Sequence, residues 1–319
     1  MTPESRGTRR TIALLLSLGA ALWSFSVFGQ LSYRQGQHVE PAYEGWRQNE
    51  DGTYSFIFGY FNENWEEEID IAVGENNRFI PGESDRGQPT HFLPRRNRFT
   101  FEVVVPADWG DREMVWELTS PNGTTRRAYA TLATDYIIDN VVIASETGSL
   151  GAGTSSPESR ANTPPRLTIL GDDVRTARVG EPVQLRAQVL DDGIPKPRPS
   201  RINSAEDLTR AMLRPPTQIT VGKRNGLFLS WNVYRGPISA TGYIQESVTF
   251  DPPQVKPWED TRTSANSPWG ALWQPPAIPE DGIYQTEVIF DQPGTYVLWG
   301  RADDGGLYND RYITVTVTP

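Results

Sequence analysis

Two pairs of neighbouring aspartates are the residues whose type and spacing most directly suggest chemistry. Asp191-Asp192 and Asp303-Asp304 are each followed by glycine. Clustered carboxylates beside backbone carbonyls are ligands that Ca²⁺ takes in proteins, so Asp191, Asp192, Asp303 and Asp304 are candidate calcium ligands. The alternative is two ordinary turns, because Asp and Gly both tolerate turn geometry. The spacing is not that of an EF-hand loop.

A second candidate site lies in the long irregular stretch 74–97. Asp85, Arg86 and His91 would together form a polar ligand site or the site of a hydrolase. The alternative is a loop held by its own Asp–Arg pairs. The sequence contains two histidines and no cysteine. His91 therefore has few partners for a metal site and no thiol to activate.

Three tryptophans in a proline-rich stretch form a third candidate surface. If Trp258, Trp269 and Trp273 are exposed, their rings would stack on sugars or on a partner protein. The alternative is that the rings fix an irregular loop onto the body of the protein. The sequence leaves both interpretations open.

The composition predicts a folded, exported protein. Hydrophobic residues make up 37% of the chain and aromatic residues 11%, which is enough to build packed cores. Its length of 319 residues is enough for two domains. A net charge of −10 excludes a typical nucleic-acid-binding protein, which needs clustered Lys and Arg. The absence of cysteine excludes disulfides and a lipoprotein anchor, so stability must come from the cores.

Residues 1–29 have the pattern of a secretory signal peptide. Arginines precede an apolar run from 11 to 28, and Val27 and Gly29 fit a cleavage site. The expected location is the periplasm or the extracellular space of a bacterium. The alternative is an uncleaved N-terminal anchor, which would be the chain's contact with a membrane.

Residues 38–133 read as a first β-sandwich domain. Short strand-like runs at 53–61, 67–73 and 98–105 follow one another with turn signals between them. Ser120-Pro-Asn-Gly123 predicts a hairpin. In the run 98–105, alternation places Phe99, Phe101, Val103 and Val105 on one side of the strand.

Residues 134–163 read as a linker. The apolar run 136–143 is a strand or a packed connector, and 145–163 is rich in Gly, Ser, Thr, Asn and Pro.

Residues 164–319 read as a second β-sandwich domain, whose clearest signal is a closing hairpin. Runs 295–302 and 312–318 flank a glycine-rich turn. An opening motif runs from Val179-Gly-Glu-Pro-Val183 to Asp191-Asp192-Gly193, and a closing motif is Pro293-Gly-Thr-Tyr-Val-Leu298. Together they resemble polycystic-kidney-disease (PKD) and related bacterial immunoglobulin-like or cadherin-like domains. The resemblance covers 162–194 and 284–319. It implies an immunoglobulin-like sandwich in which the hydroxyl of Tyr296 bonds back to the chain.

The stretch 195–280 departs from that pattern and is interpreted as a long Pro- and Trp-rich insertion. It contains a candidate helix at 204–213, capped by Ser204 and Asp207, and strand-like runs at 226–234 and 247–250. These runs are either sandwich strands or parts of an elaborated loop. If the opening and closing motifs are strands B and F, the two aspartate pairs follow them at one end of the sandwich.

The sequence as a whole predicts an all-β protein with two β-sandwich domains in tandem. We expect a non-catalytic exported binding or scaffolding protein, with an adhesion, envelope or accessory role, that acts through loops on rigid sandwiches. Partners would be a protein or a polysaccharide at the cell surface. The alternatives are a carbohydrate-binding protein that uses the three tryptophans and a hydrolase with its site in 74–97. No cofactor is expected, with calcium left open.

Overall fold

A computed structural model describes residues 34–146, 156–196, 204–213, 226–238, 247–254 and 277–319. These residues belong to one compact unit, Arg34–Pro319. Within these ranges, no helix is long and apolar enough to cross a membrane. The proposed signal segment 1–29 lies outside the described residues, so export stays a prediction.

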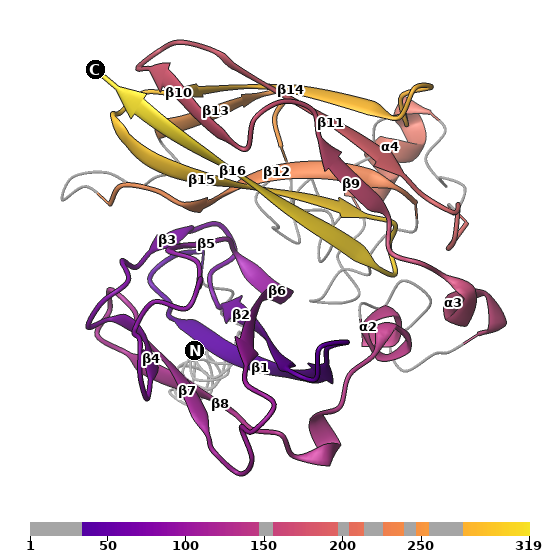
Figure 1. Cartoon of the computed structure of the whole chain (residues 1–319). Coiled ribbons are helices and arrows are strands. Elements are labelled where there is room, and N and C mark those ends of the chain that lie inside the picture. The colour runs from indigo at the N-terminus through magenta and orange to yellow at the C-terminus, as the bar shows by residue number, and fades with distance from the viewer. Residues whose placement is uncertain (1–33, 147–155, 197–203, 214–225, 239–246, 255–276) are drawn as a thin grey trace, which may run out of the picture. The chain divides into compact units, whose positions relative to one another are not determined.

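The first sandwich pairs two three-stranded antiparallel sheets and a short two-stranded one (Figure 1). One sheet has the order β1 (Val39–Gln48), β2 (Tyr54–Asn62) and β6 (Arg95–Val105), and the other has β4 (Asn77–Ile80), β7 (Met114–Thr119) and β8 (Thr125–Ala130). The short pair is β3 (Ile69–Asp70) with β5 (His91–Phe92). The expected hairpin at 120–123 joins β7 to β8.

Aromatic side chains fill the core of the first sandwich. The rings of Phe58 and Phe101 stack with centroids 5.4 Å apart, and Trp116 meets Phe101 edge to face at 5.0 Å. Phe58 and Trp116 are fully buried. Truncating such a ring to alanine typically costs about 3–5 kcal/mol, so this cluster is a main source of stability.

A bulge in β6 corrects the expectation that Phe99 shares a side with Phe101. The pairing of β2 with β6 shifts register between Phe58 and Tyr60, and Phe99 has a φ of 52°. Phe99 therefore leaves the main core and packs with Ile57 and other residues in a separate cluster. The extra residues of a bulge re-aim a side chain in a way that simple alternation does not predict.

The described part of the connection between the sandwiches contains short helices. A 3₁₀ turn, η1 (Thr134–Tyr136), precedes α2 (Asn140–Glu146), and α3 (Pro157–Ala161) follows. Asp139 accepts a hydrogen bond from the backbone N–H of Val142 at 2.9 Å, which caps α2. Ile143 and Ala144 are buried, so the run 136–143 is a packed connector and not a strand.

The second sandwich has two four-stranded sheets, drawn as two layers in Figure 1. One has the order β10 (Val174–Arg178), β16 (Tyr308–Thr318), β15 (Gly294–Asp303) and β12 (Phe228–Arg235). The other has β13 (Val248–Asp251), β14 (Ile283–Phe290), β11 (Val183–Leu190) and β9 (Arg166–Ile169). Strand β10 runs parallel to β16, while the other pairs are antiparallel. The order corresponds to an immunoglobulin-like sandwich with β11 as strand B and β15 as strand F.

Two side chains confirm the immunoglobulin-like interpretation. Trp231 on β12, the position of strand C, is 1% exposed. A Cβ on Gly300 would lie 2.7 Å from the Trp231 ring, so only glycine fits beside it. The hydroxyl of Tyr296 donates to the carbonyl of Gln292 at 3.0 Å, as the corner tyrosine was expected to do. Assignment to the PKD group in particular stays a prediction.

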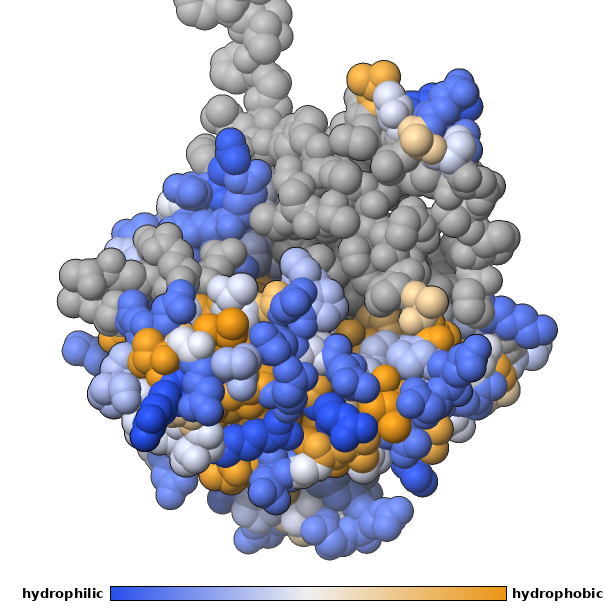
Figure 2. Space-filling model, turned by 90° about the horizontal axis from the view of Figure 1, so that it is seen from above, coloured by the Kyte–Doolittle hydropathy of each residue, from blue (hydrophilic) through white to orange (hydrophobic). Residues whose placement is uncertain are grey.

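The expected insertion 195–280 contains two of the sandwich strands. Strands β12 and β13 belong one to each sheet, which decides between the two alternatives that the sequence left open. The helix is present as α4 (Ala205–Met212), and Ser204 Oγ accepts a hydrogen bond from the N–H of Asp207 at 3.1 Å. On the face seen in Figure 2, hydrophobic and hydrophilic residues are interspersed. Along β11, buried and more exposed residues alternate.

Candidate functional site

The outward face of β12, β15 and β16 packs against the first sandwich. Tyr234 and Trp299 are nearly fully buried and belong to the core cluster of that sandwich. The hydroxyl of Tyr234 donates to the carbonyl of Gly87 at 2.5 Å, and its own carbonyl accepts from the N–H of Thr90 at 3.1 Å. We call this contact surface the joint between the sandwiches.

A buried arginine forms the polar centre of the joint. Arg301 on β15 is 1% exposed and donates two hydrogen bonds, each 2.8 Å, to the two carboxylate oxygens of Asp310 on β16. It also donates to the carbonyl of Phe99 in the first sandwich at 2.6 Å. Its guanidinium carbon lies 4.0 Å from the centre of the Tyr308 ring. One side chain thus ties both strands of the closing hairpin to the first sandwich.

Electrostatics keep this arginine charged. Burial alone would lower the pKa of Arg301, but the carboxylate of Asp310 outweighs burial and raises it. A buried charge needs its partners in place, and removing one of them typically costs about 3–5 kcal/mol. The joint therefore fixes how the two sandwiches meet.

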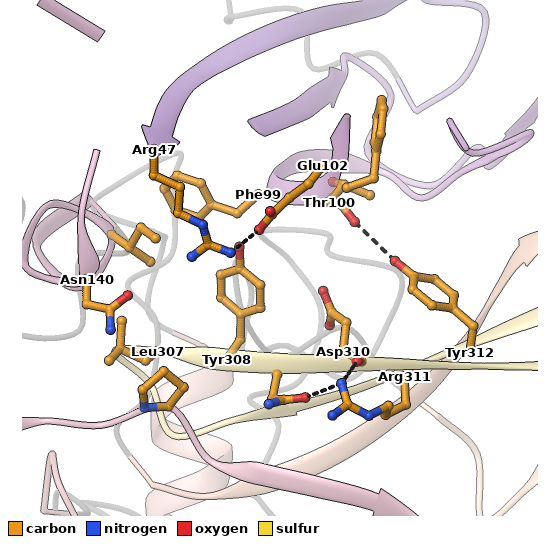
Figure 3. Close-up of a pocket in the computed structure, with 14 residues that line it drawn as sticks. Arg47, Phe99, Thr100, Glu102, Asn140, Leu307, Tyr308, Asp310, Arg311 and Tyr312 are labelled. Atoms are coloured by element: carbon orange, nitrogen blue, oxygen red, sulfur yellow. Dashed lines mark hydrogen bonds and ion pairs between the residues drawn. The ribbon is translucent and has the colours of Figure 1, made fainter. Parts of the chain in front are cut away.

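A cleft of about 340 Å³ opens beside the joint. One wall is formed by residues of β1, β6 and α2. The facing wall is formed by Leu307 and by β16, which follows it (Figure 3). The lining residues are Arg47, Phe99, Thr100, Phe101, Glu102, Asn140, Ile143, Pro164, Leu307, Tyr308, Asn309, Asp310, Arg311 and Tyr312. This volume suits a small ligand or one segment of a larger one.

Side chains on the walls of the cleft hydrogen-bond to one another. Arg47 Nη2 donates to Glu102 Oε1 at 2.6 Å, which pairs β1 with β6 across the sheet. Arg311 Nη1 donates to the side-chain oxygen of Asn309 at 2.9 Å. Figure 3 shows the Tyr308 ring rising from β16 with its hydroxyl toward the Arg47–Glu102 pair. The cleft therefore presents charged, amide and phenolic groups at defined places.

The tyrosines of the cleft remain neutral. Burial raises the pKa of both Tyr308 and Tyr312. The ring of Tyr312 meets Tyr234 edge to face with centroids 5.0 Å apart, so the joint also supports this wall. Neutral phenols, guanidinium groups and amides are groups that hydrogen-bond to polar ligands and offer ring contacts.

The three residues predicted in 74–97 have separate partners. Asp85 forms an ion pair with Arg235 of the second sandwich, with nitrogen–oxygen distances of 2.7 and 3.0 Å. That pair lowers the pKa of Asp85. Arg86 donates its backbone N–H to Gln88 Oε1 at 2.7 Å. An Asp–Arg pair does hold the loop, but the arginine comes from the other domain, so the expectation that the loop pairs with its own arginines is wrong for Asp85.

His91 is a buried cation. It is 3% exposed, with Nδ1 2.7 Å from Asp70 Oδ1 and Nε2 2.6 Å from Glu68 Oε2. Burial would lower the pKa of His91, but the two carboxylates outweigh burial and raise it to about 10. At neutral pH both ring nitrogens therefore donate. The imidazole faces carboxylates, as a hydrolase would require, yet it has no lone pair for use as a base.

The two aspartate pairs lie in adjacent loops and cap their own turns. Asp192 accepts from the N–H of Ile194 in its own turn and also from the N–H and hydroxyl of Thr163. Asp304 accepts from the N–H groups of Gly306 and Leu307. A Cβ on Gly306 would lie 3.6 Å from Pro195, so the loops after β11 and β15 share one end of the sandwich.

Among the described residues, one group of three acidic or histidine side chains brings its potential metal-ligand atoms close together. That group is His38, Glu40 and Glu63, not the aspartate pairs. Asp191, Asp192, Asp303 and Asp304 do not bring three such ligand atoms together. Calcium binding at these four residues stays a prediction.

Trp258, Trp269 and Trp273 lie outside the described residues, and their role stays a prediction.

The cleft residues have a signal in the sequence that strand alternation reveals. Tyr308, Asp310 and Tyr312 occupy alternate positions of β16 and so share one face, while Ile313, Val315 and Val317 point into the core. The three residues form an aromatic–acid–aromatic face on the closing strand. The strand predicted from the sequence, 312–318, begins after Tyr308 and Asp310 and therefore does not reveal this face.

Comparisons with known proteins give no family. No protein-family model and no curated protein matches the chain. Among solved structures, the Yersinia pseudotuberculosis adhesin InvE is 10% identical, with 88% of this chain and 58% of that chain covered and a TM-score of 0.25. The D00–D0 domain of Intimin is 9% identical, covering 88% of this chain and 100% of that chain, with a TM-score of 0.22.

The I67–I69 fragment of titin is 8% identical, covering 88% of this chain and 65% of that chain, also with a TM-score of 0.22. Scores at this level carry no argument about function.

Proposed function

We propose that this chain is an exported bacterial binding or scaffolding protein that recognises its ligand in the cleft beside the joint. The observation that carries the proposal is a cleft with polar and aromatic walls on two sandwiches joined through buried charges. A pre-organised site loses little free energy to ordering when it binds. Export is supported by the pattern of residues 1–29.

The ligand class that fits the cleft best is a polysaccharide segment. Sugar hydroxyls need several donors and acceptors at fixed positions, which Arg47, Glu102 and Asn140 offer together. Tyr312 is 37% exposed and presents a ring for the apolar face of a sugar. Binding without catalysis is the simpler role, because these groups position a ligand without an evident nucleophile–base pair.

A glycan array with the full chain tests the proposal. Binding to at least one polysaccharide is expected. Tyr312→Ala and Glu102→Gln are expected to weaken it about tenfold or more, equivalent to about 1.4 kcal/mol. Tyr129→Ala is the matched control, because Tyr129 is a 52% exposed tyrosine of β8 that does not line the cleft.

Each outcome of the array has a clear meaning. No binding to any glycan would remove polysaccharide as the ligand. Binding that Tyr312→Ala and Glu102→Gln leave unchanged would remove the cleft as the site.

A further inference from the structure

Three potential metal ligands gather at the start of β1, away from the cleft. His38 Nε2 lies 2.7 Å from Glu40 Oε1 and 3.9 Å from Glu63 Oε1. The three ligand atoms all lie within 4.8 Å of one another. The side chains are partly exposed, at 13% for His38, 36% for Glu40 and 37% for Glu63, so an ion has access from solvent.

Strand pairing explains why these residues meet. His38 directly precedes β1 and Glu40 is the second residue of that strand, so in extended chain the two side chains point to the same face, where they are hydrogen-bonded. Val39 pairs with Asn62 in the β1–β2 register, which places His38 opposite Glu63. The backbone N–H of Glu63 donates to the carbonyl of His38 at 3.1 Å. The cluster combines a His-x-Glu pair on one chain segment with a cross-strand Glu.

The backbone that carries the ligands is fixed by buried side chains. Asn64, fully buried, accepts from the N–H of Gln37 at 2.7 Å and donates to its carbonyl at 3.2 Å. Ser120 Oγ accepts from the N–H of Val39 at 2.9 Å. Both neighbours of His38 are therefore anchored. Metal sites need such support, because loosely held ligands bind weakly.

We propose that His38, Glu40 and Glu63 bind a divalent transition-metal ion, for which Zn²⁺ is the appropriate probe. One imidazole nitrogen and two carboxylate oxygens are zinc ligands. Ligand atoms at zinc bond lengths of about 2.0–2.2 Å in a tetrahedral site lie about 3.3–3.6 Å apart. The present separations of 2.7 and 3.9 Å bracket that value, so small side-chain rotations are enough to seat the ion.

Arg126 competes with the ion for one ligand. Its Nε donates to Glu40 Oε1 at 2.7 Å, the oxygen that also meets His38. A positive charge at this distance repels a divalent cation, and the pair has to rearrange before metal binds. Arg126→Gln is therefore expected to tighten zinc binding, a result that a merely structural cluster would not give.

The other histidine does not compete for zinc in the same way. Both ring nitrogens of His91 face carboxylates within the buried interior, so His38 is the histidine that solvent zinc can reach. With no cysteine in the chain, a zinc signal that depends on a histidine reports on one place.

Titration calorimetry of the untagged full chain with Zn²⁺ tests the site. We expect one ion per chain, an affinity that falls about tenfold or more in His38→Ala and Glu63→Gln, and a several-fold gain in Arg126→Gln. Glu66→Gln is the matched control, because Glu66 is a nearby carboxylate that pairs with Arg34 and is not part of the cluster. Melting curves of the metal-free variants show whether each one folds.

Two results would overturn the inference. One is the absence of stoichiometric zinc binding to the unaltered chain. The other is zinc binding with the same affinity in His38→Ala, which would assign the ion to scattered surface carboxylates. If His38→Ala fails to fold, Glu63→Gln and the opposite effect of Arg126→Gln still decide the question.

Discussion

Replacing Arg301 by methionine should destabilise the protein by about 3–5 kcal/mol. The Arg301 side chain is 2% exposed, and its loss leaves the Asp310 carboxylate, 15% exposed, without its charged partner. Asp310→Val should cost about as much, because it leaves a buried guanidinium. Equilibrium unfolding in urea, followed by tryptophan fluorescence of the full chain, measures both.

The double variant Arg301→Met/Asp310→Val separates the ion pair from general packing. With both charges gone, the main remaining loss is the donor to the carbonyls of Phe99 and Arg98, about 1 kcal/mol each. We therefore expect a cost near 2 kcal/mol, far below the sum of the single variants. The control is Arg311→Met, because Arg311 is an exposed arginine on β16 beside Asp310. Its free energy of unfolding should stay within about 0.5 kcal/mol of that of the unaltered chain. A double variant as unstable as the sum would refute the reasoning.

Three further predictions follow from single contacts. His91 has a folded pKa of about 10 against an ordinary 6.5, so its stabilisation should be full below pH 6.5 and disappear as the pH rises through about 10. Unfolding measured from pH 6 to 10.5 checks this, and a His91→Gln variant that follows the same slope would contradict it. Tyr296→Phe, which loses the 3.0 Å bond to Gln292, should cost about 1 kcal/mol, and a melting temperature equal to that of the unaltered chain would argue against the corner bond. Asp85→Ala breaks the partly exposed pair with Arg235 and should cost less than about 1 kcal/mol in urea, whereas a loss above 3 kcal/mol would show that the pair is effectively buried.

Features built from neighbouring residues could be predicted from the sequence. The closing hairpin appears as β15 and β16 because alternation and a glycine-rich turn are local signals. The Tyr296 bond spans four residues, and the Ser204 cap spans three. The all-β class with two sandwiches follows from the same short-range patterns.

Features that depend on distant partners could not be predicted in this way. Asp85 meets Arg235 across 150 residues, and Arg301 reaches Phe99 across 202. Such contacts depend on how two sandwiches pack, which strand periodicity does not encode. The bulge at Phe99 is a further case, because it depends on the register of β6 against β2. The cleft arises from these contacts and was therefore not among the predicted sites.

Hydrogen exchange of the full chain with and without a bound glycan tests the central claim most directly. If the cleft binds the ligand, protection should concentrate in peptides that contain 99–102, 140–143 and 307–312, which line it. Protection confined to other segments, with these three unchanged, would contradict the claim that the ligand binds beside the joint.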